Sequence, residues 1–144
     1  MSVVPGKISG MLSQTLVEVE RAIRSSWGVD TCAPEDIPKW HAGNPARGQC
    51  GTTALVVNDL LGGDLVCGEV HVDGRQVDNH WWNRLAGGLE LDLTREQFAP
   101  EELVVGGTPI KRPPEIVRLR EEYELLRTRV LAALEAAESA PVGR

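Results

Sequence analysis

Apolar residues recur at helical spacing in two segments, one near each end of the chain. The first covers residues 9–26, where apolar and polar positions alternate every three or four residues, which predicts an amphipathic helix. The second covers residues 115–137 and keeps a similar rhythm over three heptads. We expect this helix to pack on its own domain, with a homodimer through its apolar stripe as the alternative. The stripe contains Ile116, Leu119, Tyr123, Leu126, Val130, Ala133 and Ala137.

The centre of the chain changes from a helical to a strand-like pattern. Residues 51–61 form an apolar helical run that ends at a pair of glycines, a common stop for a helix. Residues 65–72 and 75–82 are rich in β-branched side chains, as strands favour. The pair Asp73-Gly74 between them predicts a tight hairpin turn with positive φ angles.

A third strand is predicted over residues 89–93, where apolar and acidic residues alternate. Residues 96–108 show no regular period and are expected to be irregular. Residues 28–49 hold three prolines and are expected to form a long loop with one helical turn near Glu35. The predicted fold class is therefore α+β, with a central helix on a small antiparallel sheet and further helices on either side.

Length and composition fit one globular domain. The chain has 144 residues, 42% hydrophobic and 25% charged, so we expect residues 1–144 to form a single domain. Its net charge of −6 disfavours nucleic acid as a partner, because that binding needs a basic surface. No apolar run approaches the ~18 residues that span a membrane, and the N-terminus lacks a secretory signal. We therefore expect a cytoplasmic protein.

The three cysteines are Cys32, Cys50 and Cys67. An odd number in a reducing compartment argues against a disulfide framework. Structural zinc usually shows close cysteine pairs, and none is present, so we expect no metal and no other cofactor. A metal site that uses Cys50, His80 and one further ligand is retained as an alternative.

Cys50 stands at the predicted start of the central helix. The partial positive charge of a helix N-terminus stabilises an anion, so we expect a lowered thiol pKa and a nucleophilic thiolate. His80 follows late in the second predicted strand, and Asp92 follows in the third. If these strands are neighbours, the Asp92 carboxylate can bind one ring nitrogen of His80 while the other nitrogen faces the thiol. This predicts a Cys-His-Asp nucleophilic site.

Other residues compete for the same roles. His71 lies close to the hairpin tip, and His41 lies in the long loop, where we expect it to be exposed. Asp78 is a rival partner for His80 but comes from the same strand, and Asp92 itself has the alternative of facing solvent.

Several residues near Cys50 are candidates for binding a substrate. Gln49 and Asn44 are candidate side-chain donors to an oxyanion, together with the backbone N–H of Cys50. Trp40 and Trp82 are expected to line a small cleft, with Trp81 in the core. Such a cleft suits a small molecule or a peptide end.

Three motifs together carry a resemblance to known families. Gly48-Gln-Cys50, His80-Trp-Trp-Asn83 and Asp92-Leu-Thr94 resemble the three-part pattern of transglutaminase-like and papain-like cysteine enzymes. The stretch of residues 44–63, with His80-Trp-Trp-Asn83 and residues 90–98, is similar to the small bacterial YunG-like proteins, and the similarity covers roughly residues 27–98.

The broader resemblance implies a papain-like or transglutaminase-like core at residues 44–98 and a triad of Cys50, His80 and Asp92. The function it implies is acyl transfer or hydrolysis of an amide, ester or thioester through an acyl-enzyme intermediate. It implies neither protein cross-linking nor calcium, because the histidine-to-acid interval and the domain are both small. A non-catalytic binding module that keeps the fold is the first alternative, and the metal site is the second.

Overall fold

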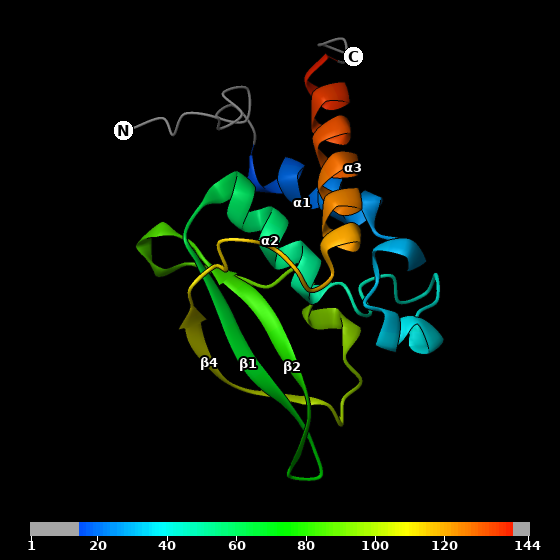
Figure 1. The fold of residues 1–144 in the computed structure, drawn as a ribbon, viewed down its shortest axis with the longest axis vertical. Helices are drawn as coiled ribbons and strands as arrows, with labels where there is room; N and C mark the ends of the chain where they lie inside the picture. Colours follow the sequence, from blue (N-terminus) through cyan, green and yellow to red (C-terminus); the bar gives the residue numbers. More distant parts are fainter. Residues whose placement is uncertain (1–14, 140–144) are drawn as a thin grey trace.

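The computed structural model describes residues 15–139, in which helices gather at one end and a long β-hairpin extends away from them (Figure 1). The helices and strands in chain order are α1 (Leu16–Ser26), α2 (Cys50–Leu61), β1 (Asp64–Val72), β2 (Arg75–Arg84), β3 (Glu90–Leu91), β4 (Leu103–Ile110) and α3 (Arg120–Ser139). Short 3-10 helices lie at Val29–Thr31, Pro34–Lys39, Ala86–Gly88 and Arg95–Gln97.

The first helix is fixed at its N-terminus by reciprocal capping. The Thr15 hydroxyl accepts the N–H of Glu18, and the Glu18 carboxylate accepts the N–H of Thr15. The predicted end at Ser26 is confirmed. Residues 9–14 of the predicted helix lie outside the described residues.

The sheet is antiparallel throughout, in the order β3-β2-β1-β4. The predicted hairpin is confirmed, since Asp73 and Gly74 have φ angles of 53° and 77° and join β1 to β2. The third strand also pairs with β2 as predicted, but it is only two residues long, Glu90–Leu91. Asp92 therefore comes after the strand instead of lying within it.

The prediction that residues 96–108 are irregular was wrong for residues 103–108, because β4 pairs there with the outer edge of β1. This strand contains Gly106, Gly107 and Pro109, residues that rarely indicate a strand. Gly107 has a packing role, because a Cβ at this position would meet the Trp82 ring at 2.7 Å. The weak strand pattern thus reflects the close approach of a tryptophan.

The last helix begins at Arg120, not near residue 115 as predicted. Leu119 has a φ of 60°, which interrupts a right-handed helix at that point. Buried residues of the predicted apolar stripe, such as Leu126 and Val130, belong to the same core cluster as Ile23 and Val57. The stripe is therefore covered within the chain, and a homodimer through it stays a prediction.

The chain is thus α+β, with a curled antiparallel sheet and flanking helices. Asn83 of β2 donates its side-chain N–H to the backbone oxygen of Ala54 at 2.9 Å, which fixes α2 against one face of the sheet. Cys50, the first residue of α2, is thereby brought to β2. Among residues 15–139, no helix is long and apolar enough to cross a membrane.

Candidate active site

His80 and Asp92 form the pair that the sequence predicted. The ring Nε2 of His80 lies 2.9 Å from Oδ1 and 2.8 Å from Oδ2 of Asp92. β3 runs antiparallel to β2 and pairs with it at Asn83 and Arg84. The chain that follows β3 therefore runs back along β2, and this brings Asp92 to His80.

The imidazole is enclosed on all sides. His80 has no exposed surface, stacks on Trp82 with ring centroids 5.4 Å apart, and meets the edge of Phe98 at 4.9 Å. Its second nitrogen, Nδ1, is buried and has no hydrogen-bond partner among the described residues. Buried polar atoms are rarely left unpaired, so this nitrogen is a candidate for function.

The Asp92 contact assigns the proton on the ring. A carboxylate only accepts hydrogen bonds, so Nε2 carries the hydrogen that Asp92 accepts. In the neutral imidazole, Nδ1 then holds a free lone pair. This is the tautomer that a general base requires.

Asp92 is held as a carboxylate by its neighbours. Burial by itself would raise the pKa of Asp92, but the hydrogen bond and charge of His80, together with Arg95, hold it below its usual value. The Arg95 Nε lies 2.6 Å from Oδ2.

Cys50 begins α2 and lies at an open edge of the sheet. The backbone N–H of Trp81 donates toward its sulfur. β3 pairs only with Asn83 and Arg84, so Trp81 has no strand partner on that side. The thiol therefore contacts the residue directly after His80.

The thiol pKa is opposite to the expectation from the helix N-terminus. Burial, with the charges of Asp78, Asp92 and Asp36, raises the pKa of the Cys50 thiol to about 12, although the Trp81 hydrogen bond lowers it. Desolvation and three carboxylates thus oppose the stabilisation of a thiolate that the helix N-terminus provides. Cys50 is protonated at neutral pH in this structure.

No hydrogen bond joins the thiol to the imidazole, since Nδ1 of His80 has no partner among the described residues. Strand alternation turns His80 and Trp82 to one face of β2, while Asn83 faces α2 on the other. The imidazole and α2 therefore lie on opposite faces of β2, and no hydrogen bond connects them in this structure.

The two predicted side-chain oxyanion donors are engaged elsewhere. The Gln49 amide nitrogen donates to the Gly28 oxygen at 2.9 Å, and its oxygen accepts from Thr31 at 2.7 Å. Asn44 donates to the Gln97 backbone oxygen at 3.0 Å. The backbone N–H of Cys50, which has no acceptor within the helix, is the donor left at the thiol.

The predicted roles of the two adjacent tryptophans are exchanged. Trp82 is buried, with 5% exposure, instead of lining a cleft. Its ring fits where Gly68 and Gly107 have no side chain, and it shields His80 from water. Trp81 is the half-buried one and lines the cavity at Cys50. Trp40 donates to the Pro45 oxygen and does not line that cavity.

The rival residues lie apart from the pair. His71 binds Glu69 near the hairpin tip, and His41 is exposed, as predicted. Asp78 accepts the N–H of Asn79 at 2.7 Å. Asp92 is thus the carboxylate that contacts His80.

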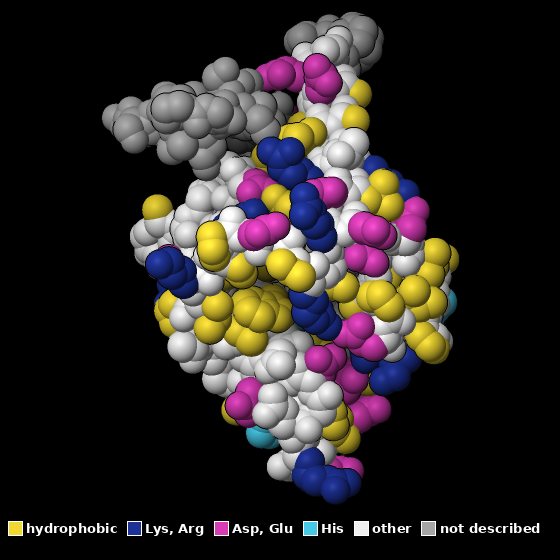
Figure 2. All heavy atoms as spheres, in the orientation of Figure 1, with side chains coloured by type: hydrophobic (Ala, Val, Ile, Leu, Met, Phe, Trp, Pro, Cys, Tyr) yellow, Lys and Arg dark blue, Asp and Glu magenta, His cyan; other side chains and the backbone are white. Residues whose placement is uncertain are grey.

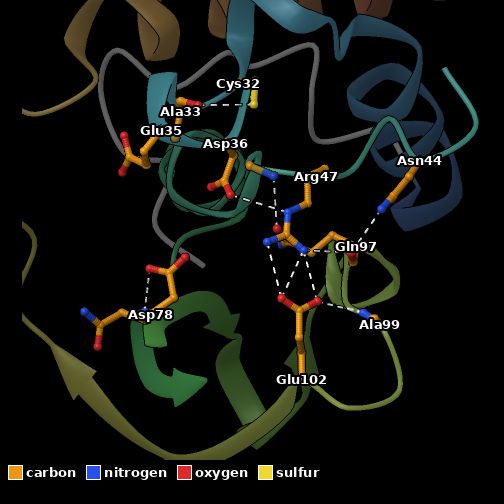
Figure 3. A network of polar contacts seen from close by, with 12 residues as sticks. Cys32, Ala33, Glu35, Asp36, Asn44, Arg47, Asp78, Gln97, Ala99 and Glu102 are labelled. Carbon is orange, nitrogen blue, oxygen red and sulfur yellow. Dashed lines mark hydrogen bonds and ion pairs between the residues drawn. The ribbon is translucent and has the colours of Figure 1, made fainter. Parts of the chain in front are cut away.

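Arg47 is an important residue that the sequence did not reveal. It is buried and bridges Asp36 at 3.4 Å and Glu102 at 3.0 Å (Figure 3). The next residue, Gly48, has a φ of 74°, and a Cβ there would collide with the Cys32 sulfur. Gln97 accepts the Gly48 N–H at 3.0 Å. These contacts fix the loop that leads into Cys50. The signal in the sequence that could have indicated Arg47 was its charge, three residues before the candidate nucleophile.

Cys50 opens into a cavity of about 240 Å³. Carboxylates of Glu35, Asp36 and Asp78 line it, with Trp81 as an apolar wall. Arg118 reaches over from the segment before α3 and bonds Glu35.

The described part of the chain contains no group of three or more His, Cys, Asp or Glu side chains placed to hold a metal. The metal alternative, with Cys50 and His80 as ligands, therefore lacks a third ligand among these residues. Cys32 is buried, and burial raises its thiol pKa to about 11. Cys67 is half-buried, with a thiol pKa raised mainly by burial.

Comparison with known sequences decides the family. The profile of a family described as YunG protein matches residues 15–135. The chain belongs to the YunG family. It is 35% identical over 87 residues to the "Uncharacterized protein YunG" of Bacillus subtilis (strain 168), a match that covers 58% of this chain and 64% of that protein. The match thus spans less than two thirds of the relative's length. No solved structure matches this YunG-family chain.

Proposed function

We propose that this YunG-family protein is a cysteine-dependent enzyme that transfers or hydrolyses an acyl group of a small molecule or peptide. Cys50 is the nucleophile, His80 the general base and acid, and Asp92 the residue that orients His80. The observation that carries the proposal is the buried imidazole with Nε2 on Asp92 and Nδ1 unpartnered among the described residues.

The first half-reaction forms a thioester. The Cys50 sulfur bonds to the carbonyl carbon of an amide, ester or thioester, and the thiol proton passes to Nδ1 of His80. The backbone N–H of Cys50 donates to the oxyanion. The bond to the leaving group then breaks, and His80 returns its proton to that group.

The second half-reaction removes the acyl group. Water or an amine attacks the thioester carbon, and its proton passes to His80. The carbon–sulfur bond breaks, the thiol regains the proton, and the acid or the new amide leaves. Asp92 stabilises the imidazolium in both halves without becoming protonated.

A raised thiol pKa is compatible with this chemistry. A serine hydroxyl is also protonated at rest in a Ser-His-Asp triad and loses its proton during attack. Cys50, with a thiol pKa of about 12, would react in the same way. A permanent thiolate–imidazolium pair is not part of the proposal.

We propose further that residues 44–98 form a papain-like or transglutaminase-like core. In support, α2 begins with the candidate nucleophile and lies against β2, which carries the candidate base. Asp92 then comes in the order that the resemblance implies.

Steady-state hydrolysis of p-nitrophenyl acetate and butyrate tests the proposal. We expect Cys50→Ala and His80→Gln to lower kcat/KM by at least about 100-fold, within the range for nucleophile and general-base losses. His71→Gln is the matched control, since His71 lies near the hairpin tip, and it should leave the rate unchanged. Equal rates in wild type and Cys50→Ala would overturn the proposal.

A non-catalytic binding module is the second candidate. The observations that favour it are the raised thiol pKa and the lack of a hydrogen bond between Cys50 and His80. A binding role predicts that Cys50→Ala retains full affinity for the physiological ligand and that wild type never forms an acyl-enzyme.

A further inference from the structure

A second cavity adjoins the one at Cys50. It has a volume of about 140 Å³ and an apolar lining that includes Leu55, Leu65, Ile116 and Val117. The two cavities share Gly51, Trp81, Arg118 and Leu119. The residue directly after the thiol therefore stands between them, and one molecule can reach into both.

The segment before α3 forms the roof of the apolar cavity. Residues 111–119 cross over the N-terminal part of α2 in Figure 1, and hydrophobic side chains form a band across this face in Figure 2. Ile116 packs against the core, whereas Val117 is 78% exposed. A volume near 140 Å³ is close to that of an apolar cavity of ~150 Å³ that binds benzene. The space thus fits a short or branched hydrocarbon group.

The cavity at Cys50 has the opposite character. Three carboxylates, those of Glu35, Asp36 and Asp78, line it. Arg118 pairs with Glu35, and Arg47 pairs with both Asp36 and Glu102. With Asp78, the carboxylates therefore outnumber the two arginines, and the cavity carries an excess of negative charge.

Asp78 carries much of that excess. Among the described residues no arginine or lysine forms an ion pair with it, and its carboxylate accepts the backbone N–H of Asn79. A low-polarity wall, Trp81, stands beside it, and such surroundings strengthen the field of a nearby charge.

We infer that the substrate of Cys50 joins a small apolar acyl group, held in the cavity under residues 111–119, to a cationic leaving group held among Glu35, Asp36 and Asp78. This rests on the proposed function, because it places the scissile carbonyl at the Cys50 sulfur. The apolar cavity selects the acyl group by size, and the carboxylates select the leaving group by charge. An anionic leaving group is rejected.

Alkylthiosulfonates test both cavities without requiring turnover. These reagents form a mixed disulfide with a thiolate and release a sulfinate. The cationic trimethylammonioethyl, anionic sulfonatoethyl, neutral methyl and neutral benzyl methanethiosulfonates are compared at pH 9. Peptide mass spectrometry reads the rate at Cys50, and each rate is divided by that of the urea-unfolded protein.

The charge test uses Asp78. In wild type, we expect the cationic reagent to exceed the anionic one at Cys50 by at least about tenfold, within the range that focused charge produces. Asp78→Asn should lower this ratio several-fold, whereas Asp73→Asn at the exposed hairpin turn should leave it unchanged. A ratio near one in the wild type would overturn the cationic part.

The size test uses two variants with opposite effects. Ile116→Trp fills the apolar cavity and should lower the benzyl-to-methyl ratio at Cys50 by about tenfold, as for a group that loses its pocket. Leu55→Ala enlarges the cavity and should keep the ratio at or above that of wild type. An unchanged ratio in Ile116→Trp would overturn the apolar part.

The outcomes separate this inference from the proposed function. Strong charge and size preferences without any acyl-enzyme support a binding site of this chemistry and contradict catalysis. An acyl-enzyme without preferences supports catalysis and contradicts the inferred substrate class.

Discussion

Asp92 holds His80 through Nε2, with both carboxylate oxygens within 2.9 Å, and leaves Nδ1 buried and unpartnered among the described residues. A histidine kept only for packing would normally satisfy both ring nitrogens. The unpaired nitrogen belongs to the residue before Trp81, whose backbone N–H points to the Cys50 sulfur. The proposed proton transfer from Cys50 to His80 depends on this relationship.

Asp92→Asn should separate orientation of the imidazole from folding. An amide oxygen still accepts a hydrogen bond, but the negative charge that stabilises an imidazolium is lost. We expect kcat to fall by about 10³- to 10⁴-fold, as for the acid of a Ser-His-Asp triad. Ester hydrolysis measures the rate, and thermal unfolding checks the fold. Arg95→Gln is the control and should cost less than about tenfold, since Arg95 contacts Asp92 and Trp82 and acts on the imidazole through them.

The pH dependence of Cys50 alkylation tests the raised thiol pKa. Only the thiolate reacts, so a pKa of about 12 means that the rate with iodoacetamide still rises at pH 10. The urea-unfolded protein, with thiols near ~8.5, should level off above about pH 9.5. A plateau for Cys50 near pH 7 in the folded protein would show instead that the helix N-terminus prevails.

Arg47→Met should destabilise the protein strongly. It leaves Asp36 and Glu102 without their cation in a largely buried position, which costs about 3 kcal/mol or more. The matched control is Arg84→Met, because Arg84 pairs with the exposed Glu90, and such pairs are worth about 0–1 kcal/mol. Urea denaturation measures the free energy of unfolding of both variants. An equal loss of this free energy in the two would contradict the structural role of Arg47.

Gly68→Ala should destabilise the sheet beside His80. A Cβ at Gly68 would meet the Trp82 ring at 2.8 Å, and overpacking of this kind costs about 1–3 kcal/mol. Gly51→Ala is the contrast, since its Cβ meets Leu119 at an ordinary 3.5 Å and alanine favours the helix by about 0.5–1 kcal/mol. Urea denaturation should show a lower free energy of unfolding for Gly68→Ala and a higher one for Gly51→Ala. A change of the same sign in both variants would contradict the packing of Trp82.

Local signals in the sequence were enough for part of this fold. The hairpin turn depends only on Asp73 and Gly74, two residue types that adopt positive φ angles. The end of α2 likewise depends on one local residue, Gly62, which also has a positive φ. The contact of His80 with Asp92 resulted from the hairpin and the next strand. The catalytic roles of these residues stay predictions.

Features that depend on distant segments could not be predicted. The sequence of β4 looked irregular because it contains Gly107, where the Trp82 ring leaves no room for a side chain. Trp82 is far from Gly107 in the sequence. The Cys50 pKa is raised by burial and by carboxylates such as Asp36 and Asp78, which come from two other segments. Gln49 looked available beside the thiol, but Gly28 and Thr31 occupy its amide. In each case, the deciding partner is a tertiary contact.

The most direct measurement is the detection of an acyl group on Cys50 before the first turnover ends. Wild type and His80→Gln are mixed with p-nitrophenyl acetate, quenched in acid after milliseconds to seconds, digested and read by peptide mass spectrometry. We predict rapid acetylation of Cys50, none at Cys32 or Cys67 on that timescale, and acetylation at least about 100-fold slower without His80. Absence of acetyl-Cys50 in the wild type, or an equal rate in His80→Gln, would contradict a Cys-His nucleophilic site.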